Sequence, residues 1–580
     1  MNLDNLLFGV SRPARYTGHE WNSVVKDWGG TKIKIVLAYP DLYEIGMSNL
    51  ALPILYDLLN RQSDVLAERV YAPWPDMEAR LRSSRLPLFS LETRHPLKEF
   101  DIVGFSLGYE LTYTNLLNML DLAGIPLLAS QRREEAPLVI AGGSCALNPE
   151  PVADFIDLFV IGEGEDVVPQ FLELYRSWKG QGTKVELLRQ ATRIPGIYVP
   201  RFYQVDHLPD GVVSRVYPVT AEASPTVLRQ VVTSLPSPVT RPVVSYIPVV
   251  HDRAAVEIQR GCSRGCRFCQ AGVIYRPVRE RPQAEVVEAV GELVKNCGYD
   301  EVGLLSLSSC DYPDIAGLVK MLTESFPGLS ISLPSLRMDS FSVALADSLR
   351  KQKKLSLTFA PEAGSQRLRC SINKDISEEE LMAAARIASE HGWRSLKLYF
   401  MAGLPTETRE DLEAVVGLVG AMRRQGRGLR IRVSVSTFVP KPHTPFQWVA
   451  QASEETINQG HQFLKSGLRR VGADLSWTDP KVSLLEAALS RGDRRLGAVL
   501  LRAWQLGCRF DAWSESFDFE KWRAAFADCG LEPGFYAHRP RPRDEVFPWS
   551  HIEVGVRKVF LWREFQRASA GRDTPDCRTE

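Results

Sequence analysis

Between residues 30 and 180, short apolar runs alternate with stretches of helical periodicity. Four such runs are KIKIVLAY (32–39), DIVGFSL (101–107), PLVIAGG (137–143) and FIDLFVIG (155–162), each ending in small or turn residues. Continuous apolar strands separated by helices are typical of a parallel sheet covered on both faces. The pattern predicts a doubly wound α/β domain over residues 1–180, with ligands gathering beyond the carboxyl ends of its strands.

A second alternation of strands and helices fills residues 251–450. Its six strand candidates are AAVEIQR (254–260), EVGLLSLS (301–308), LSISLPS (329–335), LSLTFA (355–360), SLKLYFM (395–401) and IRVSVSTF (431–438). Ser377 and Glu380 have the spacing of a capping box, which marks a helix start between the fourth and fifth strands. Six βα units predict a partial (β/α)6 barrel, whose chemistry lies at the carboxyl ends of the strands.

The two remaining regions have different patterns. Residues 181–250 are rich in Pro and Val, and Pro interrupts every strand candidate, which predicts a connector with small β elements packed between domains. Residues 451–580 have helical periodicity and dense aromatic residues, and they predict a mainly helical C-terminal domain.

Composition narrows the class of protein. A chain of 580 residues is too long for a single hydrophobic core, so two to four domains are expected. Its 44% hydrophobic and 24% charged residues are typical of a soluble globular protein. Seventy basic and seventy acidic residues cancel, so no overall field attracts nucleic acid or a membrane. The first residues, with Asp4 and no long apolar run, do not have the pattern of a signal peptide, and no run is long enough to span a membrane. Ten cysteines in a chain of this length do not indicate a disulfide framework, and seven of them are scattered, which favours a cytoplasmic setting.

Three cysteines, Cys262, Cys266 and Cys269, lie in the stretch GCSRGCRFCQ, directly after the first predicted barrel strand. Cysteine thiolates suit iron–sulfur clusters, and a cluster that only carries electrons normally has four of them. Three thiolates in one loop would hold three irons of a cubane and leave the fourth iron open to a substrate or cofactor. Zinc is the alternative, although zinc sites usually pair two short Cys or His elements, and no second pair follows this loop.

With Phe268 just before its last cysteine, this motif resembles the signature of the radical SAM enzymes. The resemblance implies a 4Fe-4S cluster on the three cysteines, with S-adenosylmethionine chelating the open iron through its amino and carboxylate groups. In that family one electron from the cluster cleaves the cofactor and makes a 5′-deoxyadenosyl radical. An electron donor of flavodoxin or ferredoxin type is the implied partner. Phe268 would pack against the adenine, or it simply fills the core.

Other strand ends stand where this family holds the cofactor. Ser308 and Ser309 replace a Gly-Gly-Glu motif for the amino group, so a backbone contact remains but the glutamate is lost. Glu362 and Arg367 fit an acceptor for a ribose hydroxyl and a bidentate partner for the cofactor carboxylate. Gly403 would let the backbone approach the adenine closely.

The N-terminal region resembles a cobalamin-binding domain. That family often has D-x-H-x-x-G after the first strand, with the histidine on cobalt, and this chain has Asp41, Tyr43 and Gly46 in the same frame. The resemblance implies a site without a protein histidine on cobalt, or a domain that has lost cobalamin and serves as a scaffold. Residues standing where the nucleotide tail is held in that family are Ser106, Gly142 and Gly143.

The leading hypothesis is therefore a radical SAM enzyme that abstracts hydrogen from an unactivated carbon, with cobalamin-dependent methylation of that carbon if a corrinoid is bound. An RNA-modifying enzyme with a scaffold domain is the alternative, and a non-catalytic iron–sulfur redox or sensor protein is a third. No catalytic residue is assigned. Residues with both a functional and an ordinary explanation are Asp311, Arg337, His443 and the basic stretch of Arg423, Arg424, Arg427, Arg430 and Arg432.

Overall fold

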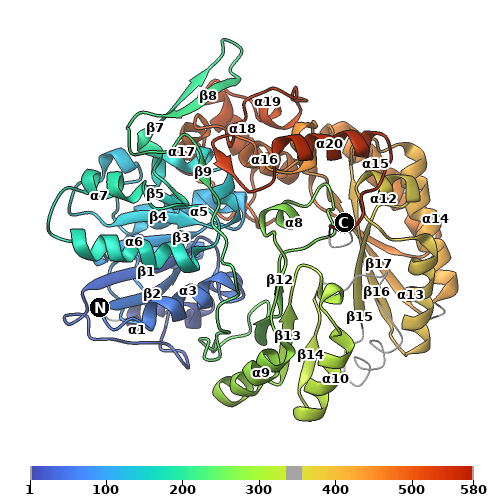
Figure 1. The fold of residues 1–580 in the computed structure, drawn as a ribbon, viewed down its shortest axis with the longest axis horizontal. Coiled ribbons are helices and arrows are strands. Elements are labelled where there is room, and N and C mark those ends of the chain that lie inside the picture. The colour runs from blue at the N-terminus through green and yellow to red at the C-terminus, as the bar shows by residue number, and fades with distance from the viewer. Residues whose placement is uncertain (1–2, 335–355, 427, 578–580) are drawn as a thin grey trace.

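The computed structural model describes residues 3–334, 356–426 and 428–577. An α/β domain at the N-terminus faces a partial barrel, and the last helices bridge the two (Figure 1). Arg337 and Arg427 lie outside the described residues.

The N-terminal sheet has six strands in the order β2-β1-β3-β4-β5-β6. The predicted strands form β1 (Ile33–Tyr39), β3 (Ile102–Ser106), β4 (Leu138–Gly142) and β5 (Leu158–Val160), and β2 (Val65–Tyr71) was not predicted. Strands β1 to β5 run parallel, whereas β6 (Ile197–Tyr198) is antiparallel to β5. The larger helices of this region are α3 (Ala51–Asn60), α4 (Pro75–Ser84), α5 (Tyr113–Leu122), α6 (Gly164–Trp178) and α7 (Lys184–Ala191).

The partial barrel consists of two parallel sheets in the described residues. One contains β10 (Ala254–Glu257), β13 (Glu301–Leu305) and β14 (Ser330–Ser332), and the other contains β15 (Ser356–Glu362), β16 (Ser395–Ala402), β17 (Arg430–Thr437) and β18 (Asp474–Trp477). The six predicted strands are all present. Strand β18 pairs in parallel with β17 and thereby extends the second sheet. It lies in the region that was predicted to be mainly helical.

Helices cover these strands and share their core. They are α9 (Gln283–Cys297), α10 (Ile315–Ser325), α12 (Gln366–Ser371), α13 (Glu378–Glu390), α14 (Arg409–Gln425) and α15 (Glu454–Arg470). The predicted capping box starts α13, since the Ser377 hydroxyl accepts from the Glu380 N–H and the Glu380 side chain accepts from the Ser377 N–H. Buried Val, Leu, Ile and Phe side chains from the strands and helices form one continuous apolar core.

The connector forms small β elements, as the sequence predicts. Strands β7 (Tyr203–His207) and β8 (Val213–Pro218) make an antiparallel hairpin. Strand β9 (Val227–Leu228) pairs in parallel with β19 (Ile552–Glu553) from near the end of the chain. Strand pairing therefore joins the connector to the last part of the chain.

The last helices pack onto the N-terminal domain and reach the barrel. Helices α16 (Pro480–Ser490), α17 (Leu496–Gln505), α18 (Phe519–Asp528) and α19 (Pro533–Ala537) contribute to the core of the N-terminal sheet. Helix α20 (Lys558–Ser569) contacts α12, and after it the Cys577 N–H lies 3.5 Å from the carbonyl oxygen of Ser263, in the loop that leads to α8 (Gln270–Ile274). No helix in the described ranges is both long enough and apolar enough to cross a membrane.

Candidate active site at the cysteine loop

The cysteine loop leaves β11 (Gln259–Arg260) through a tight turn. Gly261 has a φ of 91°, and a Cβ there would lie 2.5 Å from the Tyr275 carbonyl oxygen and 2.6 Å from that of Pro277. Only glycine fits this turn without displacing the backbone. The loop ends at α8, where the Cys269 sulfur accepts a hydrogen bond from the Gly272 N–H at 3.3 Å. The two ends of the loop are therefore held in place at Gly261 and Cys269.

The three thiols of the motif lie close enough to influence one another. The pKa of Cys269 is raised to about 12, mainly by burial and in part by negative charge on Cys266 and on Cys262, whereas Lys374 opposes the shift. All three are reduced thiols. In the described part of the chain, no three His, Cys, Asp or Glu side chains converge on a point that could hold one metal ion. A cubane cluster does not require that convergence, because each thiolate binds its own iron, so the donor set fits an iron–sulfur cluster.

Side chains from distant segments hold this loop in place. Arg267 is fully buried and donates to the carbonyl oxygens of Cys370 and Ser371 at 3.0 and 2.9 Å. Asn373 donates to the carbonyl oxygen of Arg264 at 3.0 Å. The Arg264 guanidinium pairs with Asp311, with Nε 2.9 Å from Oδ2, so the turn after β13 also touches the loop. Asp311 is therefore an ion-pair partner of the loop.

Phe268 lies where the carboxyl ends of three strands meet. It packs against a small apolar cluster that also contacts α20. The cluster draws residues that follow β15, β16 and β17, and its buried members are Ala363, Leu368, Ile372, Leu404, Phe438, Phe446 and Ala568. The Phe268 ring, which directly precedes Cys269, therefore lies together with these strand ends. The active site of a barrel lies at such strand ends.

The turn after β13 has two buried hydroxyls without partners. Ser308 and Ser309 are 2% and 0% exposed, and neither side-chain oxygen has a hydrogen-bond partner among the described residues. Buried polar groups are nearly always hydrogen-bonded, and each exception calls for an explanation. Two hydroxyls left open beside the cysteine loop fit a polar ligand that completes their hydrogen bonds.

A half-buried ion pair lies at the end of β15. Lys374 Nζ is 3.3 Å from Glu362 Oε1, and burial raises the pKa of that carboxyl while Lys374 lowers it. Glu362 has a φ of 67°, a rare conformation for a residue with a side chain, and such strain is concentrated at functional sites. Lys374 also acts electrostatically on Cys269, which places it near the loop. No motif in the sequence marks Lys374, although it follows Asn373 in a turn that contacts the loop.

Arg367 and Gly403 already have partners in the structure. The Arg367 guanidinium pairs with Asp411 and donates to the Thr406 carbonyl oxygen at 2.8 Å. The Gly403 N–H donates to Glu407 Oε1 at 2.9 Å, and burial raises the pKa of Glu407 to about 7. Gly403 has a φ of 79° and closes the turn after β16. Any contact of Arg367 with a cofactor would compete with its pairing to Asp411.

The frame Asp41-x-Tyr43-x-x-Gly46 is packed into the protein. The Asp41 carboxylate accepts from Trp513 Nε1 at 2.9 Å, and the Tyr43 hydroxyl donates to Glu20 Oε1 at 2.9 Å. A Cβ on Gly46 would lie 2.2 Å from the ring of Tyr71. These three residues therefore have structural partners in the fold.

A cavity of about 550 Å³ runs along the face of the N-terminal sheet that α3 and α6 cover. We refer to it as the deep cavity. It opens at the carboxyl ends of the strands, where the predicted residues Ser106, Gly142 and Gly143 line it together. Gly261 and Tyr275, which flank the cysteine loop and α8, line its other side. Neither Asp41 nor Tyr43 is among the described residues that line it.

Glycine keeps the deep cavity open. Gly104 lies in the middle of β3, and a Cβ there would find its nearest atoms 3.7 Å away on Ile140 and 3.8 Å away on Leu37. A glycine in a strand interior often marks a close approach of a ligand, because a larger side chain would occupy the space. Gln259 also lines the cavity, and its buried Oε1 has no hydrogen-bond partner among the described residues.

Buried ion pairs join the N-terminal domain to the barrel beside the deep cavity. Arg279 binds Glu163 with both Nη atoms, at 2.6 and 2.7 Å. Arg260 pairs with Glu165 at 2.8 Å and with Glu257 at 2.8 Å. The turn that contains Glu163 and Glu165 therefore faces the domain interface and holds the barrel against the deep cavity.

His443, Arg423 and Arg430 have their own partners in the fold. The buried His443 has Nε2 2.9 Å from the Leu147 carbonyl oxygen, and burial lowers its pKa to about 4, so it is neutral near pH 7. Arg430 pairs with Asp474 at 2.7 Å on the surface, and Arg423 hydrogen-bonds the carbonyl oxygen of Val471.

Two protein-family models match this chain. Residues 51–200 match radical SAM proteins, N-terminal, and residues 256–419 match the radical SAM superfamily. The second match contains the cysteine loop, the two serines after β13 and the Glu362–Lys374 pair. The chain belongs to the radical SAM superfamily. The arrangement of the strand ends around Phe268 agrees with this family match.

Relatives extend over different parts of this radical SAM chain. An uncharacterized protein of Methanocaldococcus jannaschii is 28% identical over 506 residues, covering 86% of this chain and 97% of that protein. A tRNA-2-methylthio-N(6)-dimethylallyladenosine synthase of Thermotoga petrophila is 30% identical over 177 residues, covering 29% of this chain and 40% of the synthase. Among solved structures, the cobalamin-dependent S-adenosylmethionine radical enzyme OxsB with aqua-cobalamin bound gives a TM-score of 0.48 at 13% identity, covering 82% of this chain and 68% of that one.

Proposed function

We propose that this radical SAM enzyme cleaves S-adenosylmethionine at a 4Fe-4S cluster on Cys262, Cys266 and Cys269, and that it uses a corrinoid in the deep cavity to methylate an unactivated carbon. The observation that carries the proposal is that the deep cavity opens beside the cysteine loop. When bound, the cluster and S-adenosylmethionine supply a 5′-deoxyadenosyl radical, and the corrinoid supplies a methyl group. An electron donor of flavodoxin or ferredoxin type would reduce the cluster.

The protein's own residues would bind and orient S-adenosylmethionine. The open hydroxyls of Ser308 and Ser309 can accept hydrogen bonds from its amino group, and Lys374 can pair with its carboxylate. Glu362 can accept from a ribose hydroxyl, and Phe268 offers an apolar surface for the adenine. Because these groups come from three different strand ends, they would hold the cofactor in one orientation over the loop.

We interpret the deep cavity as a binding site for the nucleotide tail of a corrinoid and not as an empty packing defect. Its volume lies in the range of ligand pockets, and its walls combine an apolar sheet face with glycines and the open oxygen of Gln259. No histidine is among the described residues that line it. Tyr43 is held by Glu20 and Ser245, and burial raises the pKa of its phenol above the ordinary value. We therefore propose that a bound corrinoid has no protein nitrogen on cobalt.

The test is an anaerobic preparation of the full chain with iron and sulfide, followed by a low-potential reductant and S-adenosylmethionine. Formation of 5′-deoxyadenosine and methionine is expected. Loading with hydroxocobalamin should give one corrin per chain, and the Co(II) form should show no nitrogen hyperfine splitting from a histidine. A cluster without cofactor cleavage would favour the redox or sensor alternative. Failure to bind any corrin would reject the corrinoid and leave the N-terminal domain as a scaffold.

RNA is the second candidate substrate, since the relative from Thermotoga petrophila is named as a tRNA-modifying enzyme. Its similarity covers 29% of this chain, so the substrate does not transfer with it. Incubating the reconstituted enzyme with total tRNA and S-adenosylmethionine labelled in its methyl group separates the candidates. Label in nucleosides after digestion would support RNA, and its absence despite cofactor cleavage would reject it.

A further inference from the structure

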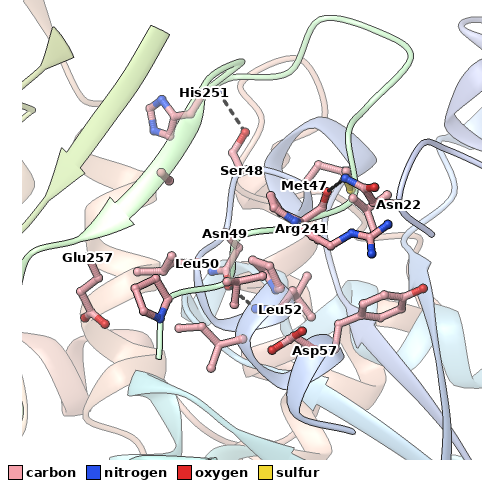
Figure 2. A pocket seen from close by; sticks show the side chains of 18 of the residues that line it. Asn22, Met47, Ser48, Asn49, Leu50, Leu52, Asp57, Arg241, His251 and Glu257 are labelled. Atoms are coloured by element: carbon pink, nitrogen blue, oxygen red, sulfur yellow. Dashed lines mark hydrogen bonds between the residues drawn. The ribbon is translucent and has the colours of Figure 1, made fainter. Parts of the chain in front are cut away.

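A second cavity, of about 420 Å³, lies between α3, the Pro-rich connector and strands β10 and β13 (Figure 2). We refer to it as the outer cavity. One wall comes from residues 46–61, and the opposite wall comes from residues 236–249. Its volume is within the range of small-molecule sites. None of the residues assigned to the cluster or to S-adenosylmethionine lines it.

The walls of the outer cavity are mainly apolar. Side chains of α3 and the segment before it face those of the connector and the first barrel strands, and the main apolar ones are Leu50, Leu52, Ile54, Val243, Val249 and Val256. Prolines at 236, 238 and 242 stiffen the connector wall, because each fixes its own backbone φ. The cavity is therefore an apolar space with a firm outer wall.

Charged side chains on this lining are paired, with one exception. Asp57 pairs with Arg61 at 2.8 Å, Arg69 with Glu20 at 2.7 Å, and Arg253 with Glu301 at 3.1 Å. Glu257 pairs with Arg260, and Arg281 pairs with Glu285. Arg241 makes no hydrogen bond or ion pair with the described residues, and it is exposed.

The two ends of the outer cavity differ in character. In Figure 2, Arg241 lies near Asn22 on one side of the pocket, and Glu257 lies on the other side. The end with Glu257 adjoins the deep cavity, since both cavities are lined by Asn49, Leu50, Ile54, Glu257 and Leu305. The end with Arg241 is the one with an unpaired positive charge.

We propose that the outer cavity is a binding site for an elongated apolar molecule with a single anionic group. The apolar walls would bury the body of the ligand, and the Arg241 guanidinium would bind its carboxylate, sulfonate or phosphate, because guanidinium matches such groups with two parallel hydrogen bonds. The far end of the ligand would point towards the deep cavity. This site does not depend on the cofactor cleavage proposed above, because none of the residues assigned to the cluster or to S-adenosylmethionine lines it.

A pair of matched fluorescent probes tests the site on the full reconstituted chain. 1-Anilinonaphthalene-8-sulfonate and N-phenyl-1-naphthylamine have the same rings and differ in the sulfonate. The anionic probe should bind with one site per chain, and Arg241→Gln should weaken it about tenfold, the loss expected for one charge-assisted hydrogen-bonding group. The neutral probe should be unaffected by Arg241→Gln. Arg61→Gln is the matched control, since Arg61 is exposed on the same lining but paired with Asp57, and it should change neither probe.

A space-filling variant locates the probes. Val239 lines the connector side of the outer cavity and is half-buried, so Val239→Trp should fill the space and weaken both probes while the circular dichroism spectrum stays unchanged. Gly104→Leu, which fills the deep cavity, should leave both probes bound. Equal affinity of the anionic probe for the parent and Arg241→Gln would overturn the proposal. Loss of the probes in Gly104→Leu, with binding kept in Val239→Trp, would overturn it as well.

Discussion

Glu564 on α20 accepts hydrogen bonds from Nε and Nη2 of Arg267 at 3.2 and 3.1 Å, and both side chains are buried. Arg267 lies between Cys266 and Cys269, so this ion pair joins the cysteine loop to a helix 297 residues further along the chain. Thr574 donates to the same carboxylate oxygen at 2.7 Å. The segment after the barrel is thus part of the structure that holds the cysteine loop.

Glu564→Ala should loosen the cysteine loop. Removing the carboxylate leaves the Arg267 guanidinium buried with only carbonyl and hydroxyl partners, and breaking a buried ion pair costs about 3 kcal/mol. We expect lower iron and sulfide content after reconstitution and faster loss of the cluster absorbance in the presence of a chelator. Gln566→Ala, an exposed position on the same helix, is the control. A cluster as durable as that of the parent would show that α20 does not support the loop.

Each cysteine of the motif should be essential for the cluster. Cys262→Ala, Cys266→Ala or Cys269→Ala removes one iron ligand, so the iron content and the electron paramagnetic resonance signal of the reduced cluster should fall sharply. Cys577→Ala is the matched control, because Cys577 lies beside the loop, with its N–H 3.5 Å from the Ser263 carbonyl oxygen, but outside the motif. A triple alanine variant that keeps the cluster signal would reject the assignment.

Lys374→Met should weaken S-adenosylmethionine binding about tenfold, because it removes the half-buried cation beside Glu362. Arg367→Ala should have a smaller effect, since Arg367 is already paired with Asp411. The change that S-adenosylmethionine causes in the resonance spectrum of the reduced cluster reports binding without turnover. A larger loss in Arg367→Ala than in Lys374→Met would restore the carboxylate role to Arg367.

Most strands of the N-terminal sheet and of the barrel were predicted from continuous apolar runs, and β2 was missed for a physical reason. Its sequence, VLAERVY, contains Glu68 and Arg69, which a pattern of apolar and polar positions assigns to the surface. In the structure they are 0% and 3% exposed, because Arg69 pairs with Glu20 and Glu92, and Glu68 accepts from Thr93. Such pairing partners lie 23 to 49 residues away, so local periodicity does not reveal them.

The candidate site was predictable to the extent that its residues directly follow a strand. The cysteines and Phe268 follow β11 and the two serines follow β13, while their roles toward a cofactor stay predictions. Lys374 follows α12 and returns to the loop only in three dimensions, and no spacing in the sequence indicates that return. Tyr43 matches a family frame in sequence, but its contacts with Glu20 and Ser245 depend on segments far from it in the chain.

Glu407 should make the stability of the barrel depend on pH. Burial raises its pKa from 4.5 to about 7, so between these values the folded protein keeps a proton that the unfolded chain has lost. Stability must then fall as the pH rises through this window. Glu407→Gln keeps the hydrogen bond to Gly403 and removes the titration, so its Tm should exceed that of the parent by a few degrees at pH 8 and match it near pH 4.5. An identical Tm difference at both pH values would contradict the assignment.

Gly104 offers the sharpest test of the deep cavity. A Cβ at this position has its nearest neighbours at 3.7 and 3.8 Å, so a side chain can enter the cavity without striking the backbone. Gly104→Ala, Gly104→Val and Gly104→Leu fill it progressively, and β-branched valine also suits the strand. The affinity for hydroxocobalamin should fall in that order, by at least tenfold for leucine, while cluster content and cleavage of S-adenosylmethionine stay at the level of the parent. Gly417→Ala, on α14 with no atom within 4 Å of the added Cβ, is the control. If leucine at position 104 left corrin binding unchanged, the deep cavity would not be the corrinoid site.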